Sequence, residues 1–289
     1  MRVAVIGANG QLGSDICHVY KQAGHDIREL NHDKIDITEF GKCSDVLKAI
    51  NPDLVISTAA MHNVEICEEN PEKSFLVNGI GARNLALLSK EIQIPLVHFS
   101  TDYIFDGQKE SPYFEDDLPI PLNVYGNTKL SGEIFLRNIA DSFFIVRVSG
   151  LYGKAACRAK GGLNFVQLML KLANEKDEIR VVDDEVLSPT YTISVAEQLE
   201  RLTQTDKYGV YHMVSEGSCS WYEFAKKIFE LAEIDIELNV AHPDEFPVKV
   251  PRPKYSVLRN RNLEAEGLNI MPHWVEGLRR YLMSLDLFV

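Results

Sequence analysis

Three glycines lie close together near the start of the chain, and their setting constrains the fold more than any other feature. Gly7, Gly10 and Gly13 follow an apolar segment, Arg2–Ile6, and open a helical pattern over Gln11–Ala23. In such a setting glycine allows a sharp turn, a close approach of backbone to a phosphate group, and tight packing of helix on strand. The free N–H groups at the start of the helix then attract the phosphate. The sequence therefore predicts a dinucleotide-binding loop.

Strands and helices alternate through residues 1–150. Short β-branched runs predict strands, and the amphipathic stretches between them predict helices. The expected strands are Arg2–Ile6, Asp26–Leu30, Leu54–Ser57, Leu96–Ser100 and Phe143–Val148, and the expected helices are Gln11–Ala23, Phe40–Ile50, Pro71–Ile92 and Val124–Asn138. This order implies parallel strands joined by right-handed crossovers. It predicts an α/β fold with a Rossmann-type doubly wound parallel sheet that binds NAD(P).

The pattern changes after Gly150, where we expect a smaller C-terminal substrate-binding lobe over residues 151–289. The expected elements are helices at Asn164–Ala173, from near Ser194, at Trp221–Ala232 and at Val275–Leu285, strands at Ile179–Val182 and Gly209–Val214, and a surface loop at Pro243–Pro253. Segments near residues 190–215 are expected to return to the main sheet, so that the lobe is discontinuous in sequence.

Composition excludes several classes of protein. The net charge of −12 disfavours a nucleic-acid-binding surface, which would need a basic patch. No apolar run approaches the ~20 residues of a membrane helix, and no secretory signal pattern opens the chain. The five cysteines form no CxxC pair and have no histidine at zinc-ligand spacing, so no metal site is predicted. We expect a cytoplasmic protein without membrane or nucleic-acid partners.

A second group of residues predicts the chemistry. Thr101 ends an apolar strand, and open α/β sheets bind their ligands at the carboxyl edge. Tyr125 and Lys129 are four positions apart, which places them on one helix face. A ketone that accepts a hydride also needs a proton, which a phenol can donate when a nearby ammonium lowers its pKa. The hydroxyl of Thr101 can hydrogen-bond the same carbonyl oxygen. Together with the glycine loop, these residues predict an NAD(P)-dependent oxidoreductase.

Longer motifs along the whole chain resemble those of one enzyme family. The matching segments are Gly7–Gly13, Ala59-Ala60, Ser100–Gly107, Pro121–Leu130, Gly132-Glu133, Asn164-Phe165, Ser188–Thr190, Trp221 and Arg252-Pro253. They resemble the dTDP-4-dehydrorhamnose reductase family of the extended short-chain dehydrogenase/reductase superfamily. The resemblance implies reduction of the 4-keto group of a nucleotide-activated 6-deoxysugar with NADP(H) or NAD(H), and Tyr125 as the proton donor. It leaves assembly as a homodimer open.

The resemblance also implies which residues form the site. Thr101, Tyr125 and Lys129 match the catalytic set, and Asp102 and Tyr103 join Thr101 along the sugar pocket. The residues expected to contact the cofactor are Gly7, Asn9, Gly10, Gln11, Leu12, Gly13, Asp36, Ile37, Ala59, Ala60, Met61, Tyr125 and Lys129. Asn78, in the following helix, has either a structural or a functional role.

The end of the second expected strand bears on the choice of cofactor. An acidic residue there would hold a ribose 2′-hydroxyl, but the chain has Asn31 and His32. NADPH is therefore permitted, with Arg28, His32 and Lys34 as candidate neighbours of its 2′-phosphate.

Two positions depart from the family pattern. Gly150 stands where the family carries a tryptophan that lies against the sugar, and Glu185 stands where it carries glutamine. Both changes affect substrate recognition, so the nucleotide and the sugar stay open. If the natural substrate is dTDP-4-keto-rhamnose, we expect a tryptophan at position 150 to restore the missing aromatic surface and lower the Michaelis constant. If the natural substrate is larger, we expect the indole to clash with it.

Two alternative functions stay open. The regulatory beta subunit of methionine adenosyltransferase resembles this family and acts as a non-catalytic binding protein. Another nucleotide-sugar reductase or an epimerase on the same scaffold is the second alternative. Dehydratases of the superfamily carry Asp-Glu after the threonine, whereas this chain has Asp102-Tyr103, which favours simple reduction.

Overall fold

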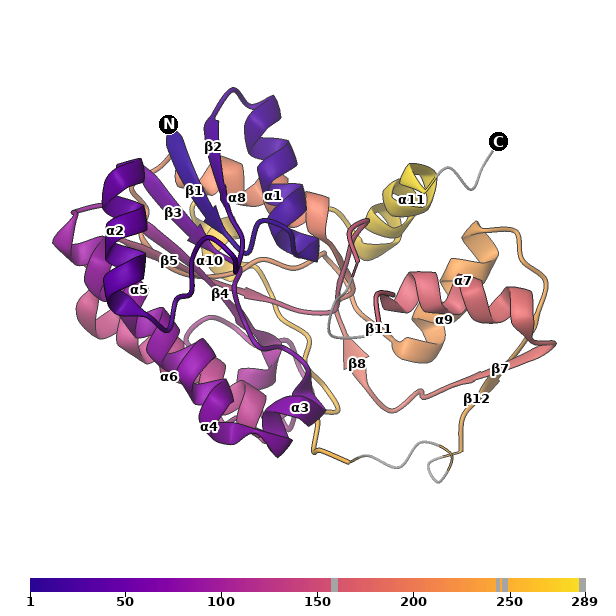
Figure 1. Cartoon of the computed structure of the whole chain (residues 1–289). Coiled ribbons are helices and arrows are strands. Elements are labelled where there is room, and N and C mark those ends of the chain that lie inside the picture. Colours follow the sequence, from indigo (N-terminus) through magenta and orange to yellow (C-terminus); the bar gives the residue numbers. More distant parts are fainter. Residues whose placement is uncertain (157–160, 243–244, 246–248, 286–289) are drawn as a thin grey trace.

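A sheet of six parallel strands forms the centre of the molecule (Figure 1). The computed structural model describes residues 1–156, 161–242, 245 and 249–285. The strand order is β10-β5-β4-β3-β1-β2. The strands are β1 (Arg2–Ile6), β2 (Asp26–Leu30), β3 (Leu54–Ser57), β4 (Leu96–Thr101), β5 (Phe143–Val148) and β10 (Gly209–His212). Because β2 and β3 flank β1, the chain winds in opposite directions from β1, and the predicted doubly wound sheet is confirmed.

Helices cover both faces of the sheet, which explains why the strands β1 and β3 are almost continuously apolar and buried, whereas the edge strand β2 is not. One face carries α1 (Gln11–Gln22) and α8 (Thr192–Thr203), and the other carries α2 (Phe40–Ile50), α5 (Gly81–Glu91) and α6 (Val124–Ile139).

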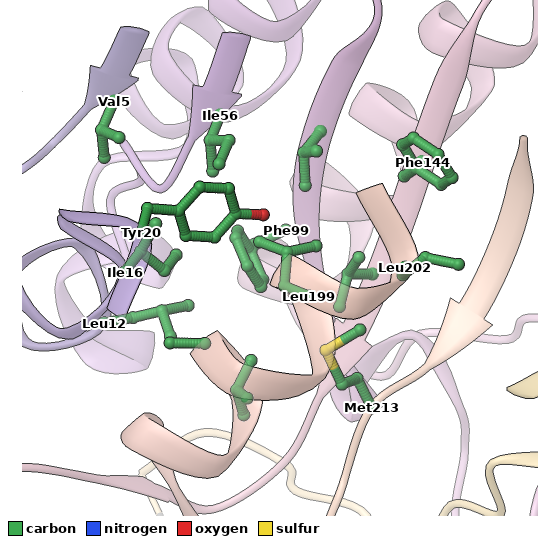
Figure 2. Packing of buried hydrophobic residues seen from close by; sticks show 14 of the residues in the cluster. Val5, Leu12, Ile16, Tyr20, Ile56, Phe99, Phe144, Leu199, Leu202 and Met213 are labelled. Carbon is green, nitrogen blue, oxygen red and sulfur yellow. The ribbon is translucent and has the colours of Figure 1, made fainter. Parts of the chain in front are cut away.

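The core under α1 and α8 is dense in large side chains. Figure 2 shows Ile16 and Tyr20 of α1 and Leu199 of α8 packed beneath Ile56 and Phe99 of the sheet. The buried phenol of Tyr20 is hydrogen-bonded to the hydroxyl of Thr203 at 2.8 Å, which satisfies its polar group.

The predicted helix over residues 71–92 contains an irregular turn. It consists of α4 (Pro71–Ser74), a π-helical segment η1 (Phe75–Ile80) and α5. Such segments are rare and occur mostly as single turns within α-helices. The short helix before it, α3 (Val64–Glu69), was not predicted; its start is capped by the Asn63 side chain, which accepts from the backbone N–H of Ile66.

The second lobe has an apolar core of its own. Its elements are α7 (Phe165–Glu175), β7 (Glu178–Val181), α9 (Trp221–Leu231), β12 (Glu237–Val240) and α11 (Trp274–Ser284). Phe224, Ile228 and Tyr281 are among its buried residues. α8 and β10, which fall in the segments near 190–215 expected to return, lie in the layers of the main sheet. The division into two domains near residue 150 stays a prediction.

Short strand pairs lie where the chain passes between the sheet and the lobe. β6 (Leu151–Tyr152) pairs with β9 (Thr190–Tyr191), and β8 (Val186–Leu187) pairs with β11 (Cys219–Ser220). The helix α10 (Arg261–Ala265) then places Leu263 back in the main core.

Three remaining expectations concern a loop, the cysteines and membrane spans. Part of the expected surface loop, namely Pro243 and positions 244 and 246–248, lies outside the described residues. Cys157 lies outside them as well. Cys17, Cys43, Cys67 and Cys219 are buried and form no disulfide. Within the described part of the chain, none of the helices has the length and apolar character needed to cross a bilayer.

Candidate active site

A cavity of about 350 Å³ lies at the carboxyl edge of the sheet. Its lining includes side chains from the sheet and α6 together with side chains from α7, β8 and α9 of the lobe side. Ten of the predicted site residues line it, namely Gly10, Gln11, Leu12, Gly13, Ala60, Thr101, Asp102, Tyr103, Tyr125 and Lys129. Residues of the predicted cofactor loop and of the predicted catalytic set therefore meet in one space.

The glycine loop has little room for side chains. Gly7 has a φ of +79°, a conformation that favours glycine. A Cβ atom at Gly13 would lie 2.2 Å from the carbonyl oxygen of Gly7, so helix and loop pack backbone against backbone. A Cβ at Gly10 would meet only that same oxygen, at 3.2 Å, and Gly10 itself lines the cavity. The first-turn N–H groups of α1, which have no partner within the helix, begin at this point.

Replacing Gly10 by valine is therefore expected to weaken NADPH binding while the fold is retained. The added side chain would occupy space that the pyrophosphate needs, at a cost of roughly 1–3 kcal/mol, which corresponds to about a tenfold to hundredfold loss of affinity. Calorimetric titration measures this change, and circular dichroism reports on the fold. The matched control is Gly41→Val, since a Cβ at Gly41 meets nothing within 4 Å and the residue lies far from the loop in sequence. Equal affinity in the two variants would contradict the assignment of the loop.

The predicted catalytic hydroxyls lie side by side. Thr101 is the last residue of β4, and Tyr125 lies in the first turn of α6, which Asn123 caps by accepting from the N–H of Gly126. The rings of Tyr125 and Tyr103 meet edge to face, with centroids 6.0 Å apart. Burial raises the pKa of the Tyr125 phenol, and a hydrogen bond with the Thr101 side chain acts in the opposite direction. The phenol is therefore protonated at neutral pH, as a proton donor must be.

Lys129 lies one helical turn after Tyr125 and is buried. Its Nζ is 3.5 Å from Nε2 of His98, on the neighbouring strand β4. Burial lowers the pKa of Lys129 to about 8, against the opposing effect of the Glu133 carboxylate. Burial, with the Lys129 charge adding to it, also lowers the pKa of His98, which is therefore neutral. Burial, which raises the pKa of Tyr125, is the largest influence on that phenol, in place of the lowering by a lysine that the sequence predicted.

This lowered pKa predicts a pH dependence of cofactor binding. Below pH about 8 Lys129 is an ammonium that attracts an anionic cofactor, and above that pH it loses its charge. The dissociation constant for NADPH should therefore rise as the pH increases through this value. Lys129→Met should bind NADPH more weakly at neutral pH and without this dependence. Calorimetry over a pH series tests both statements, and parallel curves for the two proteins would remove the electrostatic role from Lys129.

Asp102 is held by three hydroxyl groups. Its Oδ1 accepts from Thr101 at 3.0 Å, and its Oδ2 accepts from Ser149 at 2.7 Å and from Ser256 at 2.6 Å. Burial raises the pKa of Asp102, and these three hydrogen bonds lower it. The arrangement orients the Thr101 hydroxyl toward Asp102 as a donor. Sequence reasoning found Thr101 and Asp102 but missed Ser149 and Ser256, which are distant in the chain and carry no motif that links them to Asp102.

The segment around Ala60 is held by Asn78. The Asn78 side chain accepts from the backbone N–H of Met61 and donates to its carbonyl, both at 2.8 Å, and it also donates to Thr128 of α6 at 3.0 Å. Ala60 lines the cavity, whereas Ala59 and Met61 are outside its lining. These bonds support the structural role for Asn78.

The other predicted cofactor contacts lie away from the cavity. Asp36 accepts from the backbone N–H and the hydroxyl of Thr38, and Ile37 is buried against α5, where a Cβ on Gly81 would be 2.6 Å from it. Gly7 and Asn9 belong to the glycine loop but are not among the residues that line the cavity. The Asn9 N–H donates to the Asn31 side chain at 3.0 Å. Contacts of these residues with a cofactor stay predictions.

Two of the three candidate neighbours of a 2′-phosphate, Arg28 and Lys34, have partners within the protein. The Arg28 guanidinium donates to the Asp26 carboxylate at 2.9 Å, and the Lys34 ammonium donates to the carbonyl of Glu29 at 3.2 Å. Both are surface groups, and such pairs contribute little to stability.

Position 150 cannot take a tryptophan in the present backbone. Gly150 lines the cavity with a φ of +55°, in the left-handed region that favours glycine. A Cβ there would lie 2.7 Å from the side chain of Leu187 and 3.1 Å from the Cα of Pro189. The expectation that a tryptophan would simply restore an aromatic surface is wrong, because the turn after β8 occupies that space.

Comparison with known proteins agrees with this geometry. The model of a family described as the RmlD substrate binding domain matches residues 1–287. The chain belongs to this family. The spore coat polysaccharide biosynthesis protein SpsK of Bacillus subtilis (strain 168) is 41% identical over 283 residues, which cover 98% of this chain and 97% of that protein. A dTDP-4-keto-6-deoxy-D-glucose reductase of Streptomyces niveus is 33% identical, with 99% of this chain and 98% of that protein covered.

A solved structure extends this similarity to three dimensions. The dTDP-4-dehydrorhamnose reductase of Bacillus anthracis str. Ames, in complex with NADP, has a TM-score of 0.93 and 38% identity, over 98% of this chain and 99% of that one. The family predicted from the sequence motifs, dTDP-4-dehydrorhamnose reductase, is thus confirmed. The Rossmann-type fold is confirmed with it.

Proposed function

We propose that this chain reduces the 4-keto group of a nucleotide-activated 6-deoxysugar, with Tyr125 as the proton donor. The observation that carries the proposal is the convergence of Thr101, Tyr125 and Lys129 with the glycine loop in one cavity. At the coarser level, the chain is an NAD(P)-dependent oxidoreductase related over its whole length to sugar-nucleotide reductases. We propose, beyond this, that the substrate is the 4-keto-6-deoxysugar and that Tyr125 donates the proton.

The residues present fit a nicotinamide dinucleotide. Gly10 offers bare backbone to the cavity, and the start of α1 offers N–H groups and a partial positive charge to a pyrophosphate. Lys129 supplies a cation in the same cavity. When bound, the cofactor supplies the hydride that the carbonyl carbon receives.

The protein's own groups then handle the carbonyl oxygen. Tyr125 holds its proton at neutral pH, because burial raises the pKa of its phenol, and it donates that proton to the oxygen as negative charge develops there. Thr101 is adjacent to the phenol; its hydroxyl donates to Asp102 in the structure, and it orients the same oxygen once it turns its proton from Asp102 to that oxygen. With a pKa of about 8, Lys129 is mostly charged at neutral pH and favours the phenolate that the transfer leaves behind.

Oxidation of NADPH and of NADH, followed with a panel of dTDP-, UDP- and GDP-linked 4-keto-6-deoxyhexoses, tests the proposal. We expect turnover with at least one of these sugars and formation of the corresponding alcohol. Tight NADPH binding without turnover on any of them would contradict the proposal and would favour a non-catalytic binding protein. Conversion of a sugar without net oxidation of the cofactor would favour an epimerase.

A further inference from the structure

A buried histidine lies on the central strand β4, three residues before Thr101. His98 is opposite Ser57 of β3 on one side and Ile145 of β5 on the other, so it is enclosed within the sheet. The residue is 3% exposed and is not part of the cavity lining. Burying a polar ring has a free-energy cost unless the ring is hydrogen-bonded. The partner of this ring therefore indicates its role.

The imidazole of His98 contacts the proposed catalytic lysine. Its Nε2 is 3.5 Å from Nζ of Lys129, and within the described part of the chain this is the one hydrogen bond of the Lys129 side chain. A lysine ammonium has three N–H donors and no acceptor. When Nε2 accepts one of them, two remain for groups in the cavity, which Lys129 lines.

Helix α6 approaches this ring at a glycine. A Cβ atom at Gly132 would lie 3.0 Å from Nε2 of His98 and 2.8 Å from the carbonyl oxygen of Asn78. A larger residue at this position would therefore push α6 away from β4. Gly132 lies three positions after Lys129 on the same helix, so the close approach that it allows also brings the ammonium to the imidazole.

Titratable groups act on Lys129 from three elements, namely His98 of β4, Cys67 of α3, and Tyr125 and Glu133 of α6. Burial raises the pKa of the Cys67 thiol and of the Tyr125 phenol, so both are neutral at pH 7. The Glu133 carboxylate accepts its hydrogen bonds from arginine side chains. Of these four groups, the imidazole alone is hydrogen-bonded to the ammonium.

We propose that His98 is a positioning residue for Lys129, whose ammonium donates one N–H to Nε2 of the imidazole and thereby directs the other two toward the cavity. This inference rests on the proposed function, in which Lys129 attracts the cofactor and favours the phenolate of Tyr125. A hydrogen bond accepted from the charged form of a group also favours that form. His98 therefore keeps Lys129 charged to a higher pH than the same burial without an acceptor would allow.

The tautomer of His98 in the unaltered protein gives the first test. An imidazole accepts at Nε2 only when its proton is on Nδ1. Nitrogen-15 NMR of the histidine side chains distinguishes a protonated from an unprotonated ring nitrogen, and the signals that are missing from His98→Gln belong to His98. We expect an unprotonated Nε2 at pH 7. A protonated Nε2 would overturn the inference, and the measurement needs neither cofactor nor substrate.

The titration of Lys129 gives the second test. With nitrogen-15 in the lysine side chains, the Nζ signal that is absent from Lys129→Met belongs to Lys129. His98→Phe keeps a ring without an acceptor, so the pKa of Lys129 should fall from about 8 by about one pH unit. His98→Gln keeps an acceptor at the end of a side chain of similar reach, and should leave this pKa close to that of the unaltered protein. Equal pKa values in the two variants would contradict the proposal.

Calorimetry with NADPH separates positioning from a structural role. At pH 7.5, His98→Phe should weaken NADPH binding by at least about threefold, because a smaller fraction of Lys129 is charged. The same substitution in Lys129→Met should have no further effect, since the side chain that His98 positions is absent. Equal losses in the two backgrounds would show that His98 supports only the fold.

Failure of the proposed function would give a different pattern. If His98 accepts from Lys129 as expected but no 4-keto sugar is reduced, the function is wrong and the positioning role stands. If a 4-keto sugar is reduced while Nε2 of His98 carries a proton, only the positioning role is wrong.

Discussion

Tyr125→Phe should lower turnover by at least about 100-fold and leave NADPH affinity unchanged. The loss is the typical effect of removing a general acid. Phenylalanine keeps the ring that meets Tyr103 edge to face, and only the hydroxyl that bonds with Thr101 is removed. The cavity shape is therefore retained, and the change isolates proton donation from binding. Steady-state kinetics with a reducible 4-keto sugar, together with calorimetry for NADPH, separate the two quantities.

A matched tyrosine serves as the control for this prediction. Tyr208 is exposed, its phenol donates to Asp206 at the surface, and it is outside the cavity lining. Tyr208→Phe should therefore have the turnover of the unaltered protein. If Tyr125→Phe is as active as this control, another group donates the proton and the assignment of Tyr125 fails.

Arg147→Met should destabilise the protein by about 3–5 kcal/mol, the usual cost of leaving one partner of a buried ion pair without the other. Arg147 of β5 and Glu133 of α6 form a bidentate pair at 2.8 and 2.9 Å, and both side chains are 0% exposed. The guanidinium also donates to the carbonyl of Glu115 at 3.1 Å. Removing it would leave the buried Glu133 carboxylate with only the longer, partly exposed contact to Arg137 as an ion pair. The free energy of unfolding in urea measures the loss.

The same carboxylate provides the control. Arg137 also pairs with Glu133, at 3.4 Å, but its side chain is 44% exposed, so Arg137→Met should cost less than about 1 kcal/mol. The double variant Arg147→Met, Glu133→Leu should recover much of the lost stability, because it removes both buried charges and leaves only the solvent-exposed guanidinium of Arg137 without this partner. Equal losses for Arg147→Met and Arg137→Met would show that burial of the pair does not determine its contribution.

The sequence predicted best those elements that are specified by a few neighbouring residues. The strands β1, β2, β3 and β5 have the predicted bounds, and β1, β3 and β5 are short apolar or β-branched runs. The glycine loop and the pair Tyr125 and Lys129 were also found, since the spacing of their residues within one turn and one helix determines their geometry.

The parts that were missed depend on contacts between distant segments. Ser256 reaches Asp102 across 154 positions of sequence, and no local pattern records that contact. The pairing of β8 with β11, which sets Trp221 beside Glu185, joins two strands of only two residues each. The occupied space at Gly150 depends on Leu187 and Pro189, so the resemblance alone suggested a substitution that the backbone opposes.

The return of late segments to the main sheet has a consequence for synthesis on the ribosome. β1 to β5 are translated first, but the apolar face that they share with α1 is also covered by α8, and Met213, Leu263 and Met271 complete that cluster. Protein chains emerge from their N-terminus, and domains fold as units. The nascent sheet therefore exposes one apolar face until the last quarter of the chain has been made. During that interval chaperone binding to this face would compete with self-association of the incomplete chains.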